Sequence, residues 1–317
     1  MDKQIAIGAA WSGALLERLR AALPGWSVIA DAGADPAAAR AATVLVPFHM
    51  PVGREFLAGS RIRLVQQFGV GLDPVDLEAA HSLGIAVANA PSEVSGMAAS
   101  VAEGAVLLTL SCMRLPSVQA ASLAAGEWNW RMPLNRGLAG RRAGLIGFGS
   151  IGKAIARRLA AFDMRLVAVR RSGGTDDAAG FPFDWIGGPE RIEELASTSD
   201  VVVISAPLTA ETRGLFDAAL IGRMRPEASI VNVGRGPILD EAALLAALDA
   251  GRVHAAGLDV LSAEPPPADS PLLSHPRIVL TPHDAGVSDQ AFDGVARIIA
   301  DNLGRLETGQ PLKFRVV

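Results

Sequence analysis

Short apolar runs rich in valine and isoleucine alternate with alanine- and leucine-rich segments of helical periodicity along most of the chain. The runs predict strands buried on both faces, and the segments between them predict connecting helices. This alternation is typical of βα units that build a parallel sheet, so we expect an α/β fold. The predicted early strands are Gln4–Gly8, Ser27–Ala30, Thr43–Pro47, Leu64–Gln67 and Ile85–Ala88, with helices such as Pro74–His81 between them.

A longer apolar helix, predicted over Ala99–Arg114, and a loop to about Gly140 separate these strands from a larger second series. A final helix, Asp289–Leu306, and the tail Pro311–Val317 have no sheet of their own, so we expect the tail to return to the first strands. We therefore predict two doubly wound domains, with residues 96–287 inserted between 1–95 and 288–317. The strands predicted in the second series are Ala143–Gly147, Arg165–Val169, Val201–Ser205, Ser229–Val233, Ala255–Val260 and Ile278–Leu280.

Composition narrows the class of protein. The 317 residues are 50 % hydrophobic, which excludes a disordered or fibrous protein. The formal charge of −4 favours neither nucleic acid nor an anionic membrane as a partner. The single cysteine, Cys112, can form no internal disulfide and cannot supply a multi-thiolate metal site, which fits a reducing, cytoplasmic compartment. We expect no metal among the site residues. No charge-free apolar run approaches the ~20 residues that cross a bilayer. The start, Asp2–Leu16, faintly resembles a signal peptide, but we interpret it as a first strand and helix.

A glycine pattern follows the first strand of the second series directly. Gly147, Gly149 and Gly152 stand between that strand and a helix predicted over Lys153–Phe162. In a strand–turn–helix context this spacing allows a tight turn, close approach of a pyrophosphate to the backbone, and packing of helix on strand. We interpret it as a dinucleotide site. The alternative is a glycine-rich turn without a ligand.

The residues after the next strand bear on the kind of dinucleotide. A site that prefers NAD usually carries an acid there, which bonds the ribose 2′-hydroxyl. Here Arg170, Arg171 and Ser172 follow Val169. Guanidinium groups suit a 2′-phosphate through charge and forked donors, so we predict NADP over NAD. The alternative is that both arginines lie on a solvent-facing loop.

Three polar residues come just past the ends of three strands of the second series: Arg235, Glu264 and His283. Ligands of open α/β sheets bind at that end of the strands, so we expect the three to converge. Arg235 would hold a carboxylate or polarise a carbonyl, and His283 would supply a proton, because histidine titrates near physiological pH. Glu264 would orient the imidazole and favour its protonated form. Taken singly, each has an ordinary alternative: an exposed ion pair, a turn, or a capped loop.

Among the remaining histidines, only His49 follows a strand of the first series, and we keep it as a candidate substrate contact. Its neighbours Phe48 and Met50 either face the same substrate or pack in the core.

These residues carry a family resemblance. The chain from about residue 60 to 310 resembles the D-isomer-specific 2-hydroxyacid dehydrogenases. The segments that match are Gly69–Gly71 with Asp73, Val75–Leu77, Val101–Glu103, the glycine pattern, Ala206–Thr209 with Glu211 and Thr212, Val231–Gly236, Leu258–Pro265 and Thr281–His283.

The resemblance implies a Rossmann dinucleotide-binding domain inserted into a flavodoxin-like substrate domain. It implies the same three catalytic residues, an Asp259 contact with the nicotinamide amide, and backbone amides of Val70 and Gly71 that receive the substrate carboxylate. His49, Arg235 and His283 complete the expected substrate contacts. The residues expected at the coenzyme are Gly147, Phe148, Gly149, Ser150, Ile151, Gly152, Arg170, Arg171, Ser172, Ala206, Pro207, Thr212, Val233, Gly234, Asp259 and Gly286.

Members of this family commonly dimerise through the coenzyme domain, so we expect a homodimer with the Trp128–Arg131 loop at its arm. Trp128 or Trp130 either reaches the neighbouring active site or, as we favour, packs within the arm. Arg170 replaces the family's frequent acid, as in its NADP-using glyoxylate and hydroxypyruvate reductases.

We therefore expect an NADP-preferring enzyme that reduces a small 2-keto acid. The formate-oxidising branch carries an amide where Glu264 stands here, which argues against formate. Two alternatives stay open: a non-enzymatic module whose coenzyme switches a partner-binding surface, and a dehydrogenase of another small substrate such as phosphite.

Overall fold

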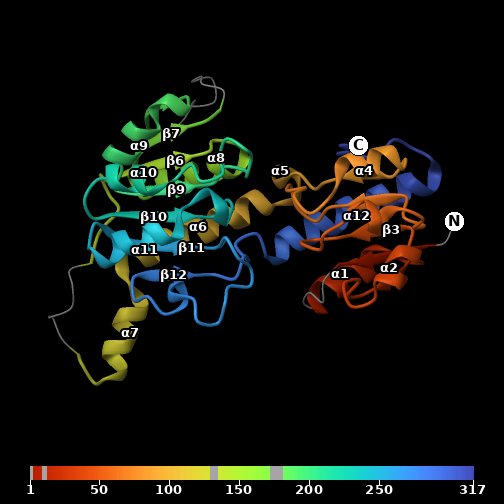
Figure 1. The fold of residues 1–317 in the computed structure, drawn as a ribbon, viewed down its shortest axis with the longest axis horizontal. Coiled ribbons are helices and arrows are strands. Elements are labelled where there is room, and N and C mark those ends of the chain that lie inside the picture. The colour runs from red at the N-terminus through yellow and green to blue at the C-terminus, as the bar shows by residue number, and fades with distance from the viewer. Residues whose placement is uncertain (1–2, 9–12, 129–134, 172–180) are drawn as a thin grey trace. The chain divides into compact units, whose positions relative to one another are not determined.

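The computed structural model describes residues 3–8, 13–128, 135–171 and 181–317 (Figure 1). The chain folds as two compact units. Unit 1 contains residues 1–97 and 287–317, and unit 2 contains residues 98–286. The predicted segments end at residues 95 and 287, beside these borders. The α/β class with two parallel sheets is confirmed.

Unit 1 is built on a five-stranded parallel sheet with the order β2-β1-β3-β4-β5. This is the flavodoxin-like strand order. Its strands are β1 (Gln4–Ile7), β2 (Ser27–Ile29), β3 (Val44–Val46), β4 (Leu64–Gln66) and β5 (Ala86–Ala88). Its helices are α1 (Gly13–Ala22), α2 (Pro36–Ala41), α3 (Arg54–Leu57), α4 (Leu77–Ser82), α5 (Ser92–Ser95) and α12 (Asp289–Thr308).

Helices cover both faces of the unit 1 sheet. Apolar residues of α1 and α12 form one core against β1, β3 and β4, and those of α2, α3 and α4 form a second core on the opposite face. The tail returns to this sheet as predicted, because Arg315 forms an antiparallel bridge with Ala88. The backbone N of Val87 donates to the carbonyl oxygen of Val317 at 3.1 Å, which covers the edge of β5.

Unit 2 is built on a seven-stranded parallel sheet with the order β12-β11-β10-β9-β6-β7-β8, as the labels of Figure 1 show for six of the strands. The first six strands of this series have the Rossmann order 3-2-1-4-5-6, with one further strand. The strands are β6 (Arg142–Ile146), β7 (Arg165–Val169), β8 (Phe183–Gly187), β9 (Val201–Ile204), β10 (Ala228–Asn232), β11 (Val253–Leu258) and β12 (Ile278–Leu280). The helices are α6 (Met97–Arg114), α7 (Pro116–Ala124), α8 (Ser150–Ala160), α9 (Ile192–Thr198), α10 (Ala218–Arg223) and α11 (Glu241–Asp249), with 3-10 turns Pro189–Arg191, Gly236–Ile238 and Pro271–Leu273.

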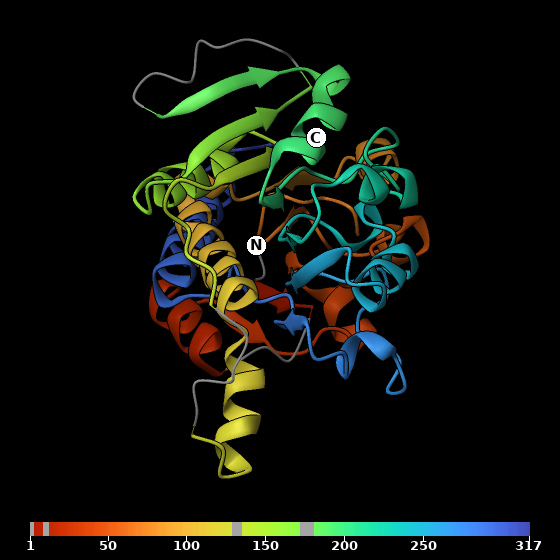
Figure 2. The same cartoon turned by 90° about the vertical axis from the view of Figure 1, so that its left-hand side faces the viewer.

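The central strands of unit 2 are buried on both faces, and all four residues of β9 are fully buried. One face packs against α9, α10 and α11 in a single apolar core. The prediction omitted two elements, β8 and α7. The strand β8 lies beside β7 at the outer edge of the sheet (Figure 2), and its sequence alternates polar with apolar residues. The helix α7 has no buried residue and projects from unit 2, so it leaves little apolar signal.

By length and composition, α6 is the one helix in the described residues that could cross a membrane. It carries Glu103 in its middle, and 56 % of the helix is buried. Leu108 and Cys112 pack directly against Gly257 of β11. A Cβ atom added to Gly257 would lie 2.8 Å from the Cβ of Leu108, so the helix could not pack this closely on a larger residue. We interpret α6 as a helix that packs on the sheet.

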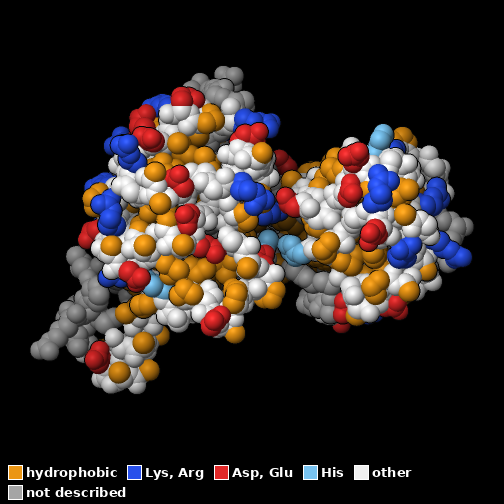
Figure 3. All heavy atoms as spheres, viewed as in Figure 1, with side chains coloured by type: hydrophobic (Ala, Val, Ile, Leu, Met, Phe, Trp, Pro, Cys, Tyr) orange, Lys and Arg blue, Asp and Glu red, His pale blue; other side chains and the backbone are white. Residues whose placement is uncertain are grey.

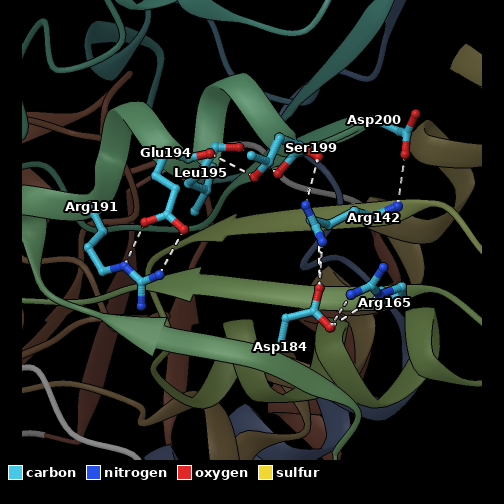
Figure 4. A network of polar contacts seen from close by, with 9 residues as sticks. Arg142, Arg165, Asp184, Arg191, Glu194, Leu195, Ser199 and Asp200 are labelled. Atoms are coloured by element: carbon cyan, nitrogen blue, oxygen red, sulfur yellow. Dashed lines mark hydrogen bonds and ion pairs between the residues drawn. The ribbon is translucent and has the colours of Figure 1, made fainter.

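Ion pairs join the amino ends of three neighbouring strands in unit 2 (Figure 4). Asp184 of β8 accepts from Arg142 of β6 at 3.0 Å and from Arg165 of β7 at 2.9 Å. Asp200, before β9, accepts from the backbone N of Arg142 at 2.9 Å. These contacts lie at the end of the sheet opposite to the glycine turn. On the visible surface, acidic and basic side chains are interspersed (Figure 3).

Candidate active site

The glycine turn follows β6 as the spacing predicts. Gly147 has a φ of 97°, and a side chain on it would meet the backbone N of Ala206 at 2.7 Å. A side chain on Gly152 would clash with the carbonyl of Gly147, whereas nothing lies within 4 Å of a Cβ on Gly149. The turn is therefore closed on the sheet side and open at Gly149, which fits the approach of a pyrophosphate to the backbone.

The helix α8 begins inside the glycine pattern, at Ser150, three residues before the predicted start. Its N-cap residue is Gly149, which supplies no side-chain hydrogen bond, so no cap side chain covers the amino end of this eleven-residue helix, an end that attracts anions. The Phe148 side chain is buried and packs edge-on against Phe183 at 4.9 Å between ring centroids. Only the backbone of Phe148 therefore suits a coenzyme contact. Ile151 is half-buried.

Arg170 and Arg171 directly follow β7. The backbone N of Arg170 donates to the carbonyl of Gly187 at 3.0 Å, and the residue is half-buried, whereas Arg171 is exposed. A hydrogen bond from Thr209 lowers the pKa of Glu211, and the charge of Arg171 acts in the same direction. Arg171 thus lies close enough to the 206–212 loop to attract the Glu211 carboxylate. Ser172 lies outside the described residues.

The 206–212 loop follows β9 and is held by its own threonines. The Thr212 hydroxyl donates to the carbonyl of Pro207 at 2.7 Å and accepts from the backbone N of Thr209 at 2.7 Å. The backbone of Ala206 packs between the turns at Gly147 and Gly234. A Cβ atom placed on either glycine would lie only 2.7 Å from a backbone atom of Ala206. The loops after β6, β9 and β10 therefore meet at one end of the sheet.

Arg235 is positioned by the last residue of β10, Asn232, which is fully buried. The Oδ1 atom of Asn232 accepts from the backbone N of Gly234 at 3.0 Å, and its Nδ2 donates to the carbonyl of Arg235 at 3.1 Å. The Nη1 of Arg235 donates to the carbonyl of Gly234 at 2.8 Å. Val233, which lies between Asn232 and Gly234 in the sequence, is buried. Asn232 is not among the residues predicted for the site, although a polar residue at the end of an apolar strand is a signal that could have found it.

His283 and Glu264 are in direct contact, as predicted. The Nδ1 of His283 lies 2.7 Å from Oε2 of Glu264. The second carboxylate oxygen, Oε1, accepts from the backbone N of Leu261 at 2.8 Å, which fixes the carboxylate. The side chains of His283 and Glu264 are 26 % and 34 % exposed, so the pair is reachable from solvent. His283 has a φ of 55°, a left-handed conformation that is costly for a residue other than glycine.

Asp259 holds the loop that carries His283. Its Oδ1 accepts from the Thr281 hydroxyl at 2.6 Å and from the backbone N of Asp284 and Ala285 at 3.0 and 3.1 Å. Its carbonyl accepts from the backbone N of His283 at 2.8 Å. Burial raises the pKa of Asp259, and the hydrogen bond from Thr281 acts against this shift. The resemblance implies a nicotinamide contact for Asp259, and the structure shows a different role, in which Asp259 fixes the histidine loop. Gly286 follows this loop directly.

The three catalytic candidates are linked through their loops. Gly236, next to Arg235, packs so tightly on Leu261 that a side chain would clash with its backbone. Leu261 in turn donates to Glu264, which contacts His283. The loops after β10, β11 and β12 thus form one continuous set of contacts at the carboxyl end of the sheet.

The substrate candidates of unit 1 lie after β3 and β4. Val70 is 46 % exposed, and its carbonyl accepts from Nδ2 of Asn89 at 3.1 Å. Gly71 and His49 follow the same ends of the strands, and His49 is exposed. Phe48 is buried in the core of unit 1 and Met50 packs against its second core, so of these three neighbours only His49 is exposed.

Two tryptophans were expected near a dimer arm. Trp128 is 87 % exposed in the structure, and Trp130 lies outside the described residues. The described residues contain no group of three or more His, Cys, Asp or Glu side chains that could hold a metal. Cys112 is buried, and burial raises its pKa to about 12, so its thiol stays protonated.

Comparison with known proteins points to one family. A family model described as "D-isomer specific 2-hydroxyacid dehydrogenase, NAD binding domain" matches residues 106–285. The match covers more than half of the chain and includes Arg235, Glu264 and His283.

The chain belongs to the D-isomer-specific 2-hydroxyacid dehydrogenases.

The matched region is a different share of each relative's length. A hydroxypyruvate reductase of Thermotoga maritima is 36 % identical over 228 residues, 71 % of each chain. A D-3-phosphoglycerate dehydrogenase of Archaeoglobus fulgidus is 34 % identical over 269 residues, 82 % of this chain but 48 % of that protein. This chain thus spans about half the length of such relatives. A dehydrogenase of this family from Xanthobacter autotrophicus Py2, solved with NADPH and MES, has a TM-score of 0.75 and 28 % identity over 100 % of this chain and 98 % of that one.

Proposed function

We propose that this protein reduces a small 2-keto acid, such as glyoxylate or hydroxypyruvate, to the D-2-hydroxy acid with NADPH. The observation that carries the proposal is the 2.7 Å contact between His283 and Glu264, on loops that adjoin the loop of Arg235. A carboxylate bound to one ring nitrogen leaves the other nitrogen to exchange a proton with a substrate oxygen.

The residues at the glycine turn fit a pyridine dinucleotide. The open space at Gly149 and the uncapped start of α8 would receive the pyrophosphate, and Gly147 and Gly152 keep the turn close to the sheet. When bound, the reduced coenzyme supplies a hydride to the carbonyl carbon of the substrate. The protein's own contribution is to bind the acid, exclude wrong orientations and deliver a proton to the carbonyl oxygen.

Each side chain of the catalytic set has one task in this proposal. Protonated His283 gives its proton to the oxygen that becomes the hydroxyl, and Glu264 holds the imidazole through Nδ1. Arg235 attracts the carboxylate or carbonyl of the substrate, because its guanidinium stays charged. In unit 1, the backbone amides of Val70 and Gly71 donate to the substrate carboxylate, and His49 adds a further polar contact.

The preference for NADP rests on Arg170 and Arg171. Neither position after β7 carries an acid that could bond a ribose 2′-hydroxyl, whereas two guanidinium groups suit a 2′-phosphate. The NADPH in the related Xanthobacter structure is compatible with this preference. The test is to measure kcat/KM with NADPH and with NADH. We expect NADPH to be favoured, and Arg170→Asp to shift the ratio toward NADH. A clear preference of the native protein for NADH would refute the arginine argument.

The substrate is tested by a screen that follows the loss of NADPH absorbance. It should include glyoxylate, hydroxypyruvate, pyruvate, phenylpyruvate and 2-ketoisocaproate. Phosphohydroxypyruvate belongs in the screen as well, because phosphoglycerate dehydrogenases are among the relatives. Turnover of glyoxylate or hydroxypyruvate well above the rest supports the proposal, and no turnover of any keto acid contradicts it.

A further inference from the structure

In unit 1, one buried side chain joins the loops that follow β3 and β4. Gln67 is 3 % exposed, and no sequence motif assigned it a role. Its Nε2 donates to the carbonyl oxygen of Phe48 at 3.0 Å, and its Oε1 accepts from the backbone N of Phe68 at 2.8 Å. Both ends of the amide are therefore used, one toward each loop.

Aromatic packing supports the same junction. The rings of Phe48 and Phe68 stack with centroids 4.5 Å apart, and Phe68 packs edge-on against Phe292 of α12 at 5.5 Å. Phe48 has a φ of 55°, which is unfavourable for a bulky residue and persists only where the surroundings hold it. The hydrogen bond from Gln67 acts on the carbonyl of this same strained residue.

The two loops carry the groups of unit 1 that the proposed function assigns to the substrate carboxylate. His49 directly follows Phe48, and Val70 and Gly71 come shortly after Phe68. The strands β3 and β4 are parallel neighbours, with Val44 opposite Leu64 and Leu45 opposite Val65, so both loops leave the sheet at the same end. A change in the contact at Gln67 would therefore shift one set of groups relative to the other.

We propose that Gln67 is a positioning residue for the substrate: it holds the His49 turn and the Val70–Gly71 loop in the fixed relation that recognises a small carboxylate. It acts through Phe48 and Phe68 and does not itself touch the acid. This inference rests on the proposed function, because it concerns the binding of the same 2-keto acid.

The adjacent residue, Gln66, offers a matched control. It is also a glutamine and fully buried. Its Nε2 donates to the carbonyl of Gln67 at 3.1 Å, and its Oε1 accepts from Nδ2 of Asn302 on α12 at 2.7 Å. Gln66 thus has the same chemistry and burial, but its side chain bonds to α12 and to the carbonyl of Gln67, and not to the turn at Phe48.

The test compares Gln67→Met with Gln66→Met. Both changes remove two hydrogen bonds at a buried site, so we expect both to lower the free energy of unfolding. Only Gln67→Met should raise KM for the 2-keto acid, by about tenfold, because small misplacements of binding groups weaken recognition strongly. Its KM for NADPH should stay within about twofold of the native value. Equal KM values for the acid in the two variants would overturn the proposal.

A second variant, Gln67→Glu, separates the two bonds of the amide. A carboxylate keeps the size and can still accept from Phe68, but it places an acceptor against the carbonyl of Phe48. We expect a rise in KM for the acid at least as large as in Gln67→Met, and a native KM in Gln67→Glu would overturn the proposal. Failure of the proposed function itself would be visible in the native protein, which would then turn over no 2-keto acid.

Discussion

The two ends of the strands in unit 2 use polar side chains differently. At the amino ends, charged side chains pair mainly with each other, as Asp184 does with Arg142 and Arg165, and one of them, Asp200, also accepts from a backbone N. At the carboxyl ends, buried Asn232 and Asp259 bond to backbone groups of the loops that carry Arg235 and His283. A side chain that bonds to the backbone determines the shape of a loop, whereas an ion pair between exposed side chains does not. The carboxyl ends are therefore where substitutions should cost most.

The largest expected effect is at the histidine. His283→Ala should lower kcat by about 10²-fold or more, because positioned acid catalysis contributes about 10²–10⁴-fold. The measurement is steady-state turnover of the 2-keto acid with NADPH. His275→Ala is a suitable control, since His275 belongs to the same unit and faces Asp249 instead. Near-native turnover of His283→Ala would remove this residue from the mechanism.

The next effect concerns the buried amide behind Arg235. Asn232→Ala leaves the backbone N of Gly234 and the carbonyl of Arg235 without their bonds to Asn232. We expect a loss of about 1–3 kcal/mol in the free energy of unfolding, together with a higher KM for the keto acid. Urea denaturation and kinetics on one preparation measure both. A loss of stability with unchanged KM would show that the turn keeps its shape without Asn232.

A smaller effect depends on pH. Burial raises the pKa of Asp259, so the folded protein binds this proton more tightly than the unfolded chain does. The native protein should lose stability as pH rises from the ordinary aspartate pKa of about 3.9 through the raised value. The Asp259→Asn variant keeps an oxygen that can accept from Thr281. Its amide does not titrate, so it should not show this loss of stability with rising pH. In urea denaturation, the free energy of unfolding of the variant relative to that of the native protein should therefore rise with pH across that window. Parallel profiles of the two proteins would contradict this explanation.

The smallest effect is expected at the amino ends. Asp184→Asn weakens the ion pairs with Arg142 and Arg165, whose side chains are partly exposed. Such pairs contribute about 0–1 kcal/mol, and kinetic parameters should not change. Thermal unfolding and turnover measure the outcome. If this change reduced turnover as strongly as Asn232→Ala does, the contrast between the two ends of the sheet would be wrong.

Much of the fold could be predicted, because buried strands have a simple signature. The predicted bounds of β7 and β12 agree with the structure, and the other predicted strands differ by one or two residues at their ends. Both sheets, the return of the tail and the contact of Glu264 with His283 follow from patterns along the chain. Polar residues after apolar strands come together because parallel strands end on one side.

The features that could not be predicted depend on tertiary contacts, which leave little or no signal in the local sequence. The edge strand β8 and the projecting α7 bury few residues, so their hydrophobic pattern is weak. Phe48 follows a strand next to a histidine, yet its stacking on Phe68 decides that it is buried. Asn232 and Asp259 stand out as polar residues at the ends of apolar strands, but their hydrogen bonds to the loops of Arg235 and His283 depend on the folded shape of those loops.

The pairing of the tail with β5 has a practical consequence. An uncovered outer strand exposes unpaired amide and carbonyl groups, which recruit other chains into intermolecular sheets. The backbone of residues 314–317 satisfies these groups at Val87 and Asn89. Shortened versions that end before Pro311 should therefore lose solubility before they lose activity, and an affinity tag is better fused at the other end of the chain.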